Sequence, residues 1–145
     1  MRLIIQRVSQ ASVTIENQLI SQIKRGLLIL IGIHHQDHEE QAAFLADKCL
    51  NLRIFNDDQN KMNLSLLDIK GEALVISNFT LYGDCEKGRR PSFTDAAPPE
   101  PAKKLYEFFV DQLKLSGLVI VQGIFGAAMK VDLCNEGPVT LMIEK

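Results

Sequence analysis

Residues 77–81, Ser-Asn-Phe-Thr-Leu, combine residue types that can take part in acyl-transfer chemistry. They place small polar side chains directly after an apolar run at residues 73–76 that predicts a buried strand. Backbone N–H groups become free where a strand ends, and N–H groups that point into a pocket can stabilise an oxyanion. Taken alone, the segment is more simply interpreted as a strand end with locally bonded hydroxyl groups.

A second segment with unusual residues is Asn135-Glu136-Gly137-Pro138-Val139-Thr140 near the end of the chain. Asparagine, glycine and proline in such close succession usually indicate a turn. A bond that precedes proline is cis in only about 5–6% of cases in folded proteins. The sequence therefore predicts a turn here and does not decide the isomer of the Gly137-Pro138 bond.

Other common catalytic patterns are missing from the sequence. There is no G-x-S-x-G motif and no glycine-rich phosphate loop, so we expect neither an elbow nucleophile nor a cofactor. The only histidines are His34, His35 and His38. His34 and His38 have the spacing of a metal-binding pair on a helix, but His34 is expected at a strand end and no further ligand is close in sequence. We expect no metal site.

The densest basic run is Lys87-Gly88-Arg89-Arg90-Pro91. The chain as a whole carries a formal net charge of −2, so a general electrostatic attraction to nucleic acid is not expected. A local group of Lys87, Arg89 and Arg90 could still contact phosphates beside an active site. Composition alone favours the plainer interpretation, in which these side chains are simply solvated.

Four apolar runs predict strands in the first quarter of the chain, at residues 3–8, 11–16, 19–24 and 27–33. Short turns separate them, so the sequence predicts a β-meander. Asp37 is expected to cap a helix that begins near residues 38–40. The expected face of this helix consists of Phe44, Leu45, Lys48, Cys49 and Leu52.

The second half of the chain begins with a long loop at residues 82–101, which is rich in glycine, proline and charge. Core-forming sequence on both sides of this loop indicates a functional loop and not a linker. A second helix is expected from the prolines at residues 98–101 to about residue 115. Its expected face consists of Leu105, Phe108, Phe109, Gln112 and Leu113. Strands are expected at residues 118–121, 129–134 and 139–143.

The whole pattern predicts a single α/β domain over residues 1–145, with a curled, barrel-like sheet and two main helices. The three cysteines are far apart and form no C-x-x-C pair, which favours a reducing compartment. The longest apolar run, residues 27–33, is too short to cross a bilayer. We therefore expect a cytoplasmic protein without membrane association.

Taken together, these segments resemble the D-aminoacyl-tRNA deacylase family. Residues 77–80 match the family's Ser-Gln-Phe-Thr motif except that Asn78 replaces glutamine, and residues 135–140 match Asn-x-Gly-Pro-Val-Thr throughout. The likeness covers essentially the whole chain in order. Further segments that resemble the family are Met1-Arg2, Gln6-Arg7-Val8, Tyr82–Cys85, Lys87–Phe93, Ala96–Pro99, Phe125–Ala127 and Met129.

The resemblance implies a hydrolase that removes D-amino acids from tRNA as a homodimer. It implies that Gly137-Pro138 is cis and reaches from one subunit into the pocket of the other, where its backbone would exclude L side chains. Glycine has no side chain to exclude, so glycyl-tRNA mischarged on tRNA-Ala is an expected further substrate. Phe125 and Met129 are expected at this substrate site. Lys87, Arg89 and Arg90 become candidate contacts to the tRNA.

The resemblance also implies the catalytic groups. The backbone N–H groups of Phe79 and Thr80 are expected to stabilise the oxyanion, with Ser77 and Asn78 beside them. Thr80 could be a covalent nucleophile, but the sequence shows no base for it. Alternatively Thr80 orients substrate or water while the ribose 2′-hydroxyl assists, and we favour this role. The rival functions are a non-catalytic tRNA-binding module, a related deacylase with relaxed chirality and a purely structural dimer.

Overall fold

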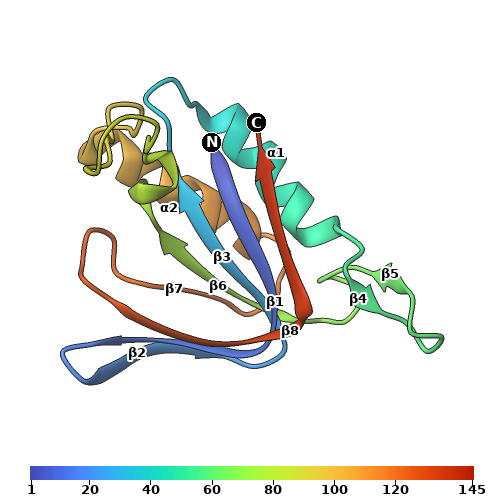
Figure 1. Ribbon diagram of the computed structural model, residues 1–145. Coiled ribbons are helices and arrows are strands. Elements are labelled where there is room, and N and C mark those ends of the chain that lie inside the picture. Colours follow the sequence, from blue (N-terminus) through green and yellow to red (C-terminus); the bar gives the residue numbers. More distant parts are fainter.

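A computed structural model describes all residues from Met1 to Lys145 (Figure 1). Its centre is a six-stranded sheet with the order β2-β1-β3-β6-β7, in which β8 pairs with the other edge of β1. A separate two-stranded ribbon joins β4 and β5. The strands are β1 (Arg2–Ile15), β2 (Gln18–Ile23), β3 (Gly26–Gly32), β4 (Phe55–Asn56), β5 (Met62–Leu64), β6 (Glu72–Ser77), β7 (Ile120–Gln122) and β8 (Lys130–Glu144).

The predicted β-meander is wrong in its pairing. The runs at residues 3–8 and 11–16 join into the single strand β1, and β3 pairs with the first half of β1 instead of with β2. Both β2 and β3 run antiparallel to β1, β2 along its second half and β3 along its first. One long strand therefore pairs with two short ones. The positions of turns in the sequence do not reveal this pairing.

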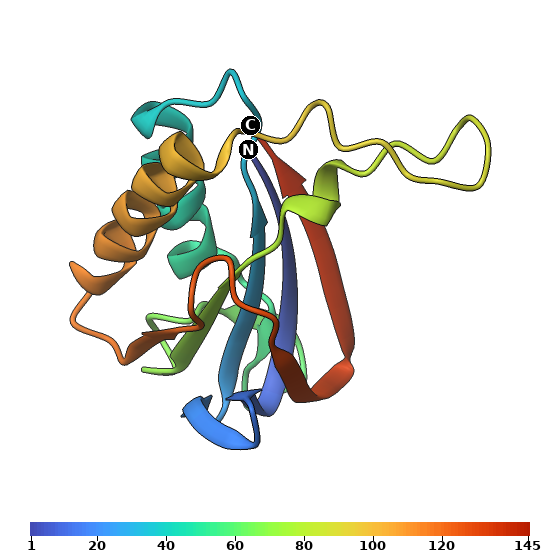
Figure 2. The same ribbon diagram turned by 90° about the vertical axis from the view of Figure 1, so that its left-hand side faces the viewer.

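Two helices, α1 (Glu39–Asn51) and α2 (Pro99–Lys114), cover one side of the sheet (Figure 2). Each belongs to a crossover between parallel neighbours, because β3 pairs in parallel with β6 and β6 in parallel with β7. Leu3, Ile5 and Ile29 of the sheet join Leu45 and Phe109 of the helices in the main hydrophobic core. The expected α/β architecture with a barrel-like sheet and two main helices is confirmed.

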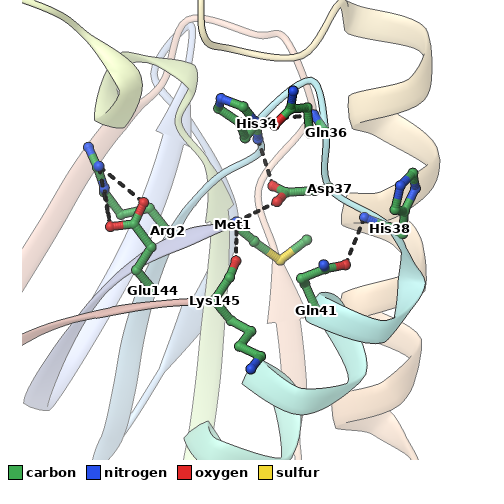
Figure 3. A network of polar contacts seen from close by, with 9 residues as sticks. All are labelled: Met1, Arg2, His34, Gln36, Asp37, His38, Gln41, Glu144 and Lys145. Atoms are coloured by element: carbon green, nitrogen blue, oxygen red, sulfur yellow. Dashed lines mark hydrogen bonds and ion pairs between the residues drawn. The ribbon is translucent and has the colours of Figure 1, made fainter.

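The N-terminus of α1 differs from the prediction. Asp37 is not the cap, because the residue before the helix is His38, whose N–H donates to the Gln41 side chain at 3.0 Å. The Asp37 carboxylate instead accepts hydrogen bonds from the Met1 amine at 2.5 Å and from the His34 N–H at 2.7 Å (Figure 3). Asp37 thus stabilises the junction between the start of β1 and the end of β3.

The buried faces of the helices are shifted relative to the predicted ones. Leu45 and Cys49 of α1 are buried as expected, whereas Phe44 is exposed and its ring lies 5.5 and 5.2 Å from the ammonium groups of Lys48 and Lys145. Alanines fill the rest of the α1 face. Because a helix packed closely on a sheet needs small residues at the contact, a search for large apolar residues misses them. The buried residues of α2 are Ala102, Tyr106, Phe109, Val110 and Leu113.

The opposite side of the sheet carries a second, smaller apolar cluster. Its buried members are Val8, Ala11, Val13, Ile23, Leu28, Leu74 and Ile76. Neither α1 nor α2 covers this side of the sheet (Figure 2). No helix of the chain has the length and apolar character needed to cross a bilayer.

Candidate active site

A cavity of about 770 Å³ opens where β6 ends and α2 begins. Its wall is mostly apolar and draws on the second apolar cluster, on the start of α2 and on the loop before β8. Only three residues with polar side chains line it, Gln6, Ser77 and Asn78. A concave apolar pocket with a few polar groups is typical of a small-ligand site.

The predicted segment at residues 77–80 lies at this cavity. Ser77 ends β6, Asn78 follows, and a short 3₁₀ helix, η1 (Phe79–Tyr82), begins at Phe79. Ser77, Asn78 and Phe79 line the cavity. The Asn78 N–H donates to the Ile31 carbonyl at 2.8 Å, which ties this turn to the end of β3.

The two expected oxyanion donors differ in their hydrogen bonding. The Phe79 N–H donates to no acceptor in the chain, as expected at the start of a helix. The Thr80 N–H, in contrast, donates to Asn78 Oδ1 at 3.2 Å. Phe79 therefore offers the donor that is open in this structure, while the Thr80 donor is occupied by the Asn78 side chain.

The Thr80 hydroxyl donates to the same oxygen, Asn78 Oδ1, at 2.5 Å. An amide oxygen does not accept a proton at neutral pH, so this partner cannot activate Thr80 as a nucleophile. Thr80 is exposed and does not itself line the cavity. The geometry fits a residue that orients its surroundings.

Phe125 and Met129, both expected at the substrate site, line the cavity. The Phe125 ring packs against Tyr106 of α2 at a centroid distance of 5.7 Å. Met129 lies so close to Gly123 that a Cβ there would meet the methionine sulfur at 2.6 Å. Glycine at position 123 leaves room for the Met129 side chain, which would have to shift if a Cβ were present there.

Two exposed phenylalanines meet at the cavity. Phe79 is 58% exposed and Phe93 is 38% exposed, and their rings form an edge-to-face pair with centroids 5.0 Å apart. Phe93 comes from the long loop after η1, and it lines the cavity although no motif singles it out in the sequence. Aromatic rings of this kind offer faces for stacking as well as apolar area.

The segment at residues 135–140 is not a turn between two strands, as its residue types predict, but a bulge inside the single strand β8. Gln6 of β1 pairs with Thr140, and Val8 pairs with Asn135, so residues 136–139 all lie opposite Arg7 alone. The Gly137-Pro138 bond is cis. Neither residue lines the cavity of its own chain, and both are exposed.

Arg7 of β1 supports this bulge by hydrogen bonding. Its side chain is almost fully buried and donates from Nε to the Glu136 carbonyl at 3.0 Å and from Nη1 to the Ile54 carbonyl at 2.6 Å. A Cβ on Gly137 would meet Arg7 Nη2 at 2.8 Å, and Gly137 has a φ of +124°. Position 137 therefore requires glycine both for its conformation and for its close contact with Arg7.

The Asn135 and Thr140 side chains close the bulge. Asn135 Oδ1 accepts from the Val139 N–H at 3.1 Å, and Asn135 Nδ2 donates to Thr140 Oγ1 at 2.8 Å. The asparagine and threonine of the predicted motif thus bond to each other across the residues that they enclose. This arrangement explains why a segment with turn-forming residues stays within a strand.

The basic residues Lys87, Arg89 and Arg90 lie on an arm formed by residues 83–95 that projects away from the body of the protein (Figure 2). Asp84 and Ser92 pair across the base of the arm with hydrogen bonds of 2.8 and 2.9 Å. All three basic side chains are exposed and make no ion pair within the chain. Their charge is free to meet an external anion.

The histidine pair considered from the sequence does not assemble. His38 precedes α1. His34 and His35 instead lie near Asp95, the last residue of the arm, with ligand atoms within 4.8 Å of one another. His34 Nδ1 already accepts a hydrogen bond from the Gln36 N–H at 3.1 Å. The group therefore serves to fasten the arm, because the His35 N–H also donates to the Asp95 carbonyl at 3.2 Å.

Comparison with known proteins shows clear similarity. A family model described as D-Tyr-tRNA(Tyr) deacylase matches residues 4–144. Proteins named D-aminoacyl-tRNA deacylase from Thermosipho melanesiensis and Petrotoga mobilis are 54% and 57% identical over 145 residues, each covering 99% of this chain and 97% of the relative.

Two solved structures are similar in fold. One, titled "c-Myc DNA Unwinding Element Binding Protein", has a TM-score of 0.94 and 40% identity and covers 100% of this chain and 99% of its own. The other, titled "Structural Analysis of a probable eukaryotic D-amino acid tRNA deacylase", has a TM-score of 0.85 over 98% of this chain and 97% of its own. Its identity of 18% supports a likeness of fold alone.

Proposed function

Because the chain belongs to the D-Tyr-tRNA(Tyr) deacylase family, we propose that it hydrolyses the ester bond of D-aminoacyl-tRNA and releases free tRNA and a D-amino acid. The match of the family model over residues 4–144 is the observation that carries this function. The enzyme is then a carboxylic ester hydrolase that acts in the quality control of translation. Its tRNA substrate makes the cytoplasm its expected location.

The oxyanion is stabilised first by the Phe79 N–H. When water attacks the ester carbonyl, negative charge develops on the carbonyl oxygen, and a donor aimed at that oxygen contributes about 2.7–4 kcal/mol in the transition state. The Phe79 N–H is unbonded and belongs to a residue that lines the cavity, which supports this role. The Thr80 N–H can contribute only when the Asn78 side chain releases it.

Thr80 acts by orientation. The bond of its hydroxyl to an amide oxygen supports this role over that of a nucleophile. The nucleophile is then water, assisted by the neighbouring ribose 2′-hydroxyl. Aminoacyl esters are already reactive, so holding the ester and the water in place beside an oxyanion donor supplies much of the rate. Ser77 and Asn78 complete the polar end of the pocket.

The active form is a homodimer in which each pocket is completed by its partner. The Gly137-Pro138 bulge is exposed and does not line the pocket of its own chain, which supports a role for it in a second copy. Strand β8 supports the same arrangement, because it pairs only with β1 and leaves its other edge open. Met142 and Leu133 of β8 are 64% and 38% exposed and offer apolar area for the interface.

The bulge selects the chirality of the substrate. In the dimer its backbone carbonyls hold the α-ammonium group, so that an L side chain would collide with the main chain while a D side chain points away. Phe125 and Met129 form the wall that faces this filter. Rejection of a substrate then depends only on the side chain at its Cα position. Glycine has no side chain and is not rejected, so glycyl-tRNA mischarged on tRNA-Ala is a second substrate.

The arm supplies contacts to the body of the tRNA. Phe93 of the arm lines the cavity, and the three unpaired basic residues Lys87, Arg89 and Arg90 lie on the part of the arm farther from the cavity. They can therefore reach phosphates near the acceptor end of the tRNA. These contacts position the substrate without reading its sequence.

Turnover of matched D- and L-tyrosyl-tRNA tests the function. The enzyme should release tRNA repeatedly from the D-ester and spare the L-ester. Binding of both without turnover would identify a non-catalytic tRNA-binding module or a structural dimer. Equal rates on both would identify a deacylase with relaxed chirality.

A further inference from the structure

We propose that Gln6 contacts the substrate: its amide oxygen accepts a hydrogen bond from a donor group at the aminoacyl-adenosine end of the tRNA. This inference rests on the proposed function and adds a residue to the site. Gln6 lines the cavity although it is more than 70 residues away in sequence from Ser77 and Asn78, the other polar side chains of the wall.

The strand pairing places Gln6 on the cavity face of the sheet. Gln6 lies directly opposite Leu28 of β3, and Leu28 lies opposite Leu74 of β6. Residues paired across a sheet point to the same face. Leu28 lines the cavity and belongs to the second apolar cluster. Gln6 is therefore the polar member of a row whose neighbours on the β3 side are leucines.

On its other side Gln6 is held by β8. Its Nε2 donates to Thr140 Oγ1 at 3.3 Å, and the same oxygen accepts from Asn135 Nδ2 at 2.8 Å. The Gln6 amide oxygen accepts no hydrogen bond within the chain. A glutamine amide has both a donor and an acceptor function, and only the donor is used here. Holding the nitrogen in place fixes the position of the open oxygen.

The chemistry of the pocket indicates that the partner of this oxygen is a donor group of the substrate. No acidic residue lines the cavity, and the oxygen of Asn78 already accepts two hydrogen bonds from Thr80. The aminoacyl-adenosine end carries three kinds of donor, namely the α-ammonium group, the ribose hydroxyl and the adenine amino group. Leaving an amide oxygen without a donor in an apolar pocket is unfavourable, so a bound substrate that supplies one gains affinity.

Calorimetric titration of a Gln6→Leu variant tests the contact. The probes are adenosine and a non-hydrolysable analogue in which an amide replaces the ester of D-alanyl-adenosine. Loss of one hydrogen bond should weaken the analogue about tenfold. An equal loss with adenosine would assign the donor to the nucleoside, and a loss confined to the analogue would assign it to the α-ammonium group. Unchanged affinity for both probes would overturn the proposal.

Gln10→Leu is the matched control, because Gln10 lies on the same strand but does not line this cavity. Thr140→Val provides a second test that leaves Gln6 in place and removes its anchor. We expect a smaller loss of affinity for Thr140→Val and recovery in Thr140→Ser, which keeps the hydroxyl. Should Gln6→Leu bind the probes normally but sediment as a monomer, Gln6 would be an interface residue and the proposal would be wrong.

Turnover of D-tyrosyl-tRNA by the wild-type enzyme, measured in parallel, separates a failure of this proposal from a failure of the proposed function.

Discussion

Asn78 has a central place at the residue scale, because its side chain decides which backbone donors are free. Its Oδ1 accepts from both the N–H and the hydroxyl of Thr80, and it leaves the Phe79 N–H open. The family motif has glutamine here, which is one methylene longer. The Asn78 side chain bonds locally to Thr80, and Phe79 is therefore the residue that we propose as the main oxyanion donor.

A Phe79→Pro variant tests that role because it removes the N–H and keeps the backbone. Phe79 is the first residue of a 3₁₀ helix, where proline is tolerated, and Asn78 before it is extended with φ −145° and ψ 90°. We expect kcat on D-tyrosyl-tRNA to be about 10²–10³-fold lower in Phe79→Pro than in Phe79→Ala, which loses the ring but retains the donor. Equal kcat values in the two variants would exclude Phe79 as the oxyanion donor.

Thr80→Val distinguishes orientation from covalent catalysis. Removal of a true nucleophile commonly costs about 10⁶-fold in kcat. Since the Thr80 hydroxyl bonds only to an amide oxygen, we expect a loss of about tenfold or less, the size of one hydrogen bond. Single-turnover deacylation measures this, with Thr80→Ser as the control that retains the hydroxyl. A loss of several orders of magnitude in the valine variant alone would contradict the orienting role.

Tyr82 predicts a pH dependence of stability. Burial, followed by the nearby carboxylates of Asp37 and Glu144, raises the pKa of Tyr82 from 10.0 to about 12. Between these two values the folded state keeps a proton that the unfolded state has lost. The contribution of Tyr82 to the free energy of unfolding is therefore complete below pH 10.0 and decreases as the pH rises towards about 12.

Urea unfolding across this alkaline range measures the effect. The urea midpoint of a Tyr82→Phe variant should fall less steeply with pH than that of the wild type. Burial also raises the pKa of Tyr106, so part of the slope should remain in the variant. Identical slopes in the two proteins would show that Tyr82 is not responsible.

At the scale of elements, the sequence predicts most strands and both helices but not how they pair. The apolar run at residues 27–31 indicates a buried strand because every residue in it is apolar, and it becomes β3. In contrast, β8 carries asparagine, glycine and proline in its middle, and these residues mimic a turn. Contacts that depend on the fold keep that segment within the strand, among them the Arg7 bond to Glu136 and the bonds of Asn135 to Val139 and Thr140.

The candidate site shows the same division. Ser77, Asn78, Phe79, Phe125 and Met129 could be selected from their motifs, and all five line the cavity. Gln6 and Phe93 could not, because their place at the cavity depends on strand pairing and on the path of the arm. An isolated glutamine in a strand gives no signal until the residues opposite it are known.

The arm makes a prediction at this scale. Replacing Lys87, Arg89 and Arg90 together with alanine should raise KM for D-aminoacyl-tRNA, because the contacts to phosphates are lost. Each such contact on a duplex also makes the log of the affinity fall by about 0.9 per unit of log salt. In the triple variant the slope of log KM against log salt should therefore be smaller, by the contribution of up to about three phosphate contacts. Steady-state kinetics at several salt concentrations measure this slope.

A Lys103→Ala/Lys104→Ala variant is the control, because both lysines are exposed but paired with glutamates on α2. If the control and the triple variant had the same salt slope, the arm would not bind the tRNA.

At the scale of the whole molecule, one chain offers a pocket and a bulge that do not meet. The pocket lies at the end of β6, whereas Gly137 and Pro138 are exposed on an edge strand and are absent from the pocket wall. A two-fold symmetric pair could bring the bulge of each copy to the pocket of the other and cover both open edges at once. The central claim is therefore that selection against L-aminoacyl esters is supplied by the partner subunit.

Complementation in mixed dimers tests this claim most directly. One subunit carries Phe79→Pro in the pocket, and the other carries Gly137→Ala, whose added Cβ would collide with Arg7 and disturb the bulge. In a mixed dimer the intact pocket then receives the intact bulge. Random pairing of equal amounts should restore about a quarter of the wild-type D-tyrosyl-tRNA turnover per subunit, with L-tyrosyl-tRNA still spared. Turnover that stays at the level of the two separate variants would contradict the claim.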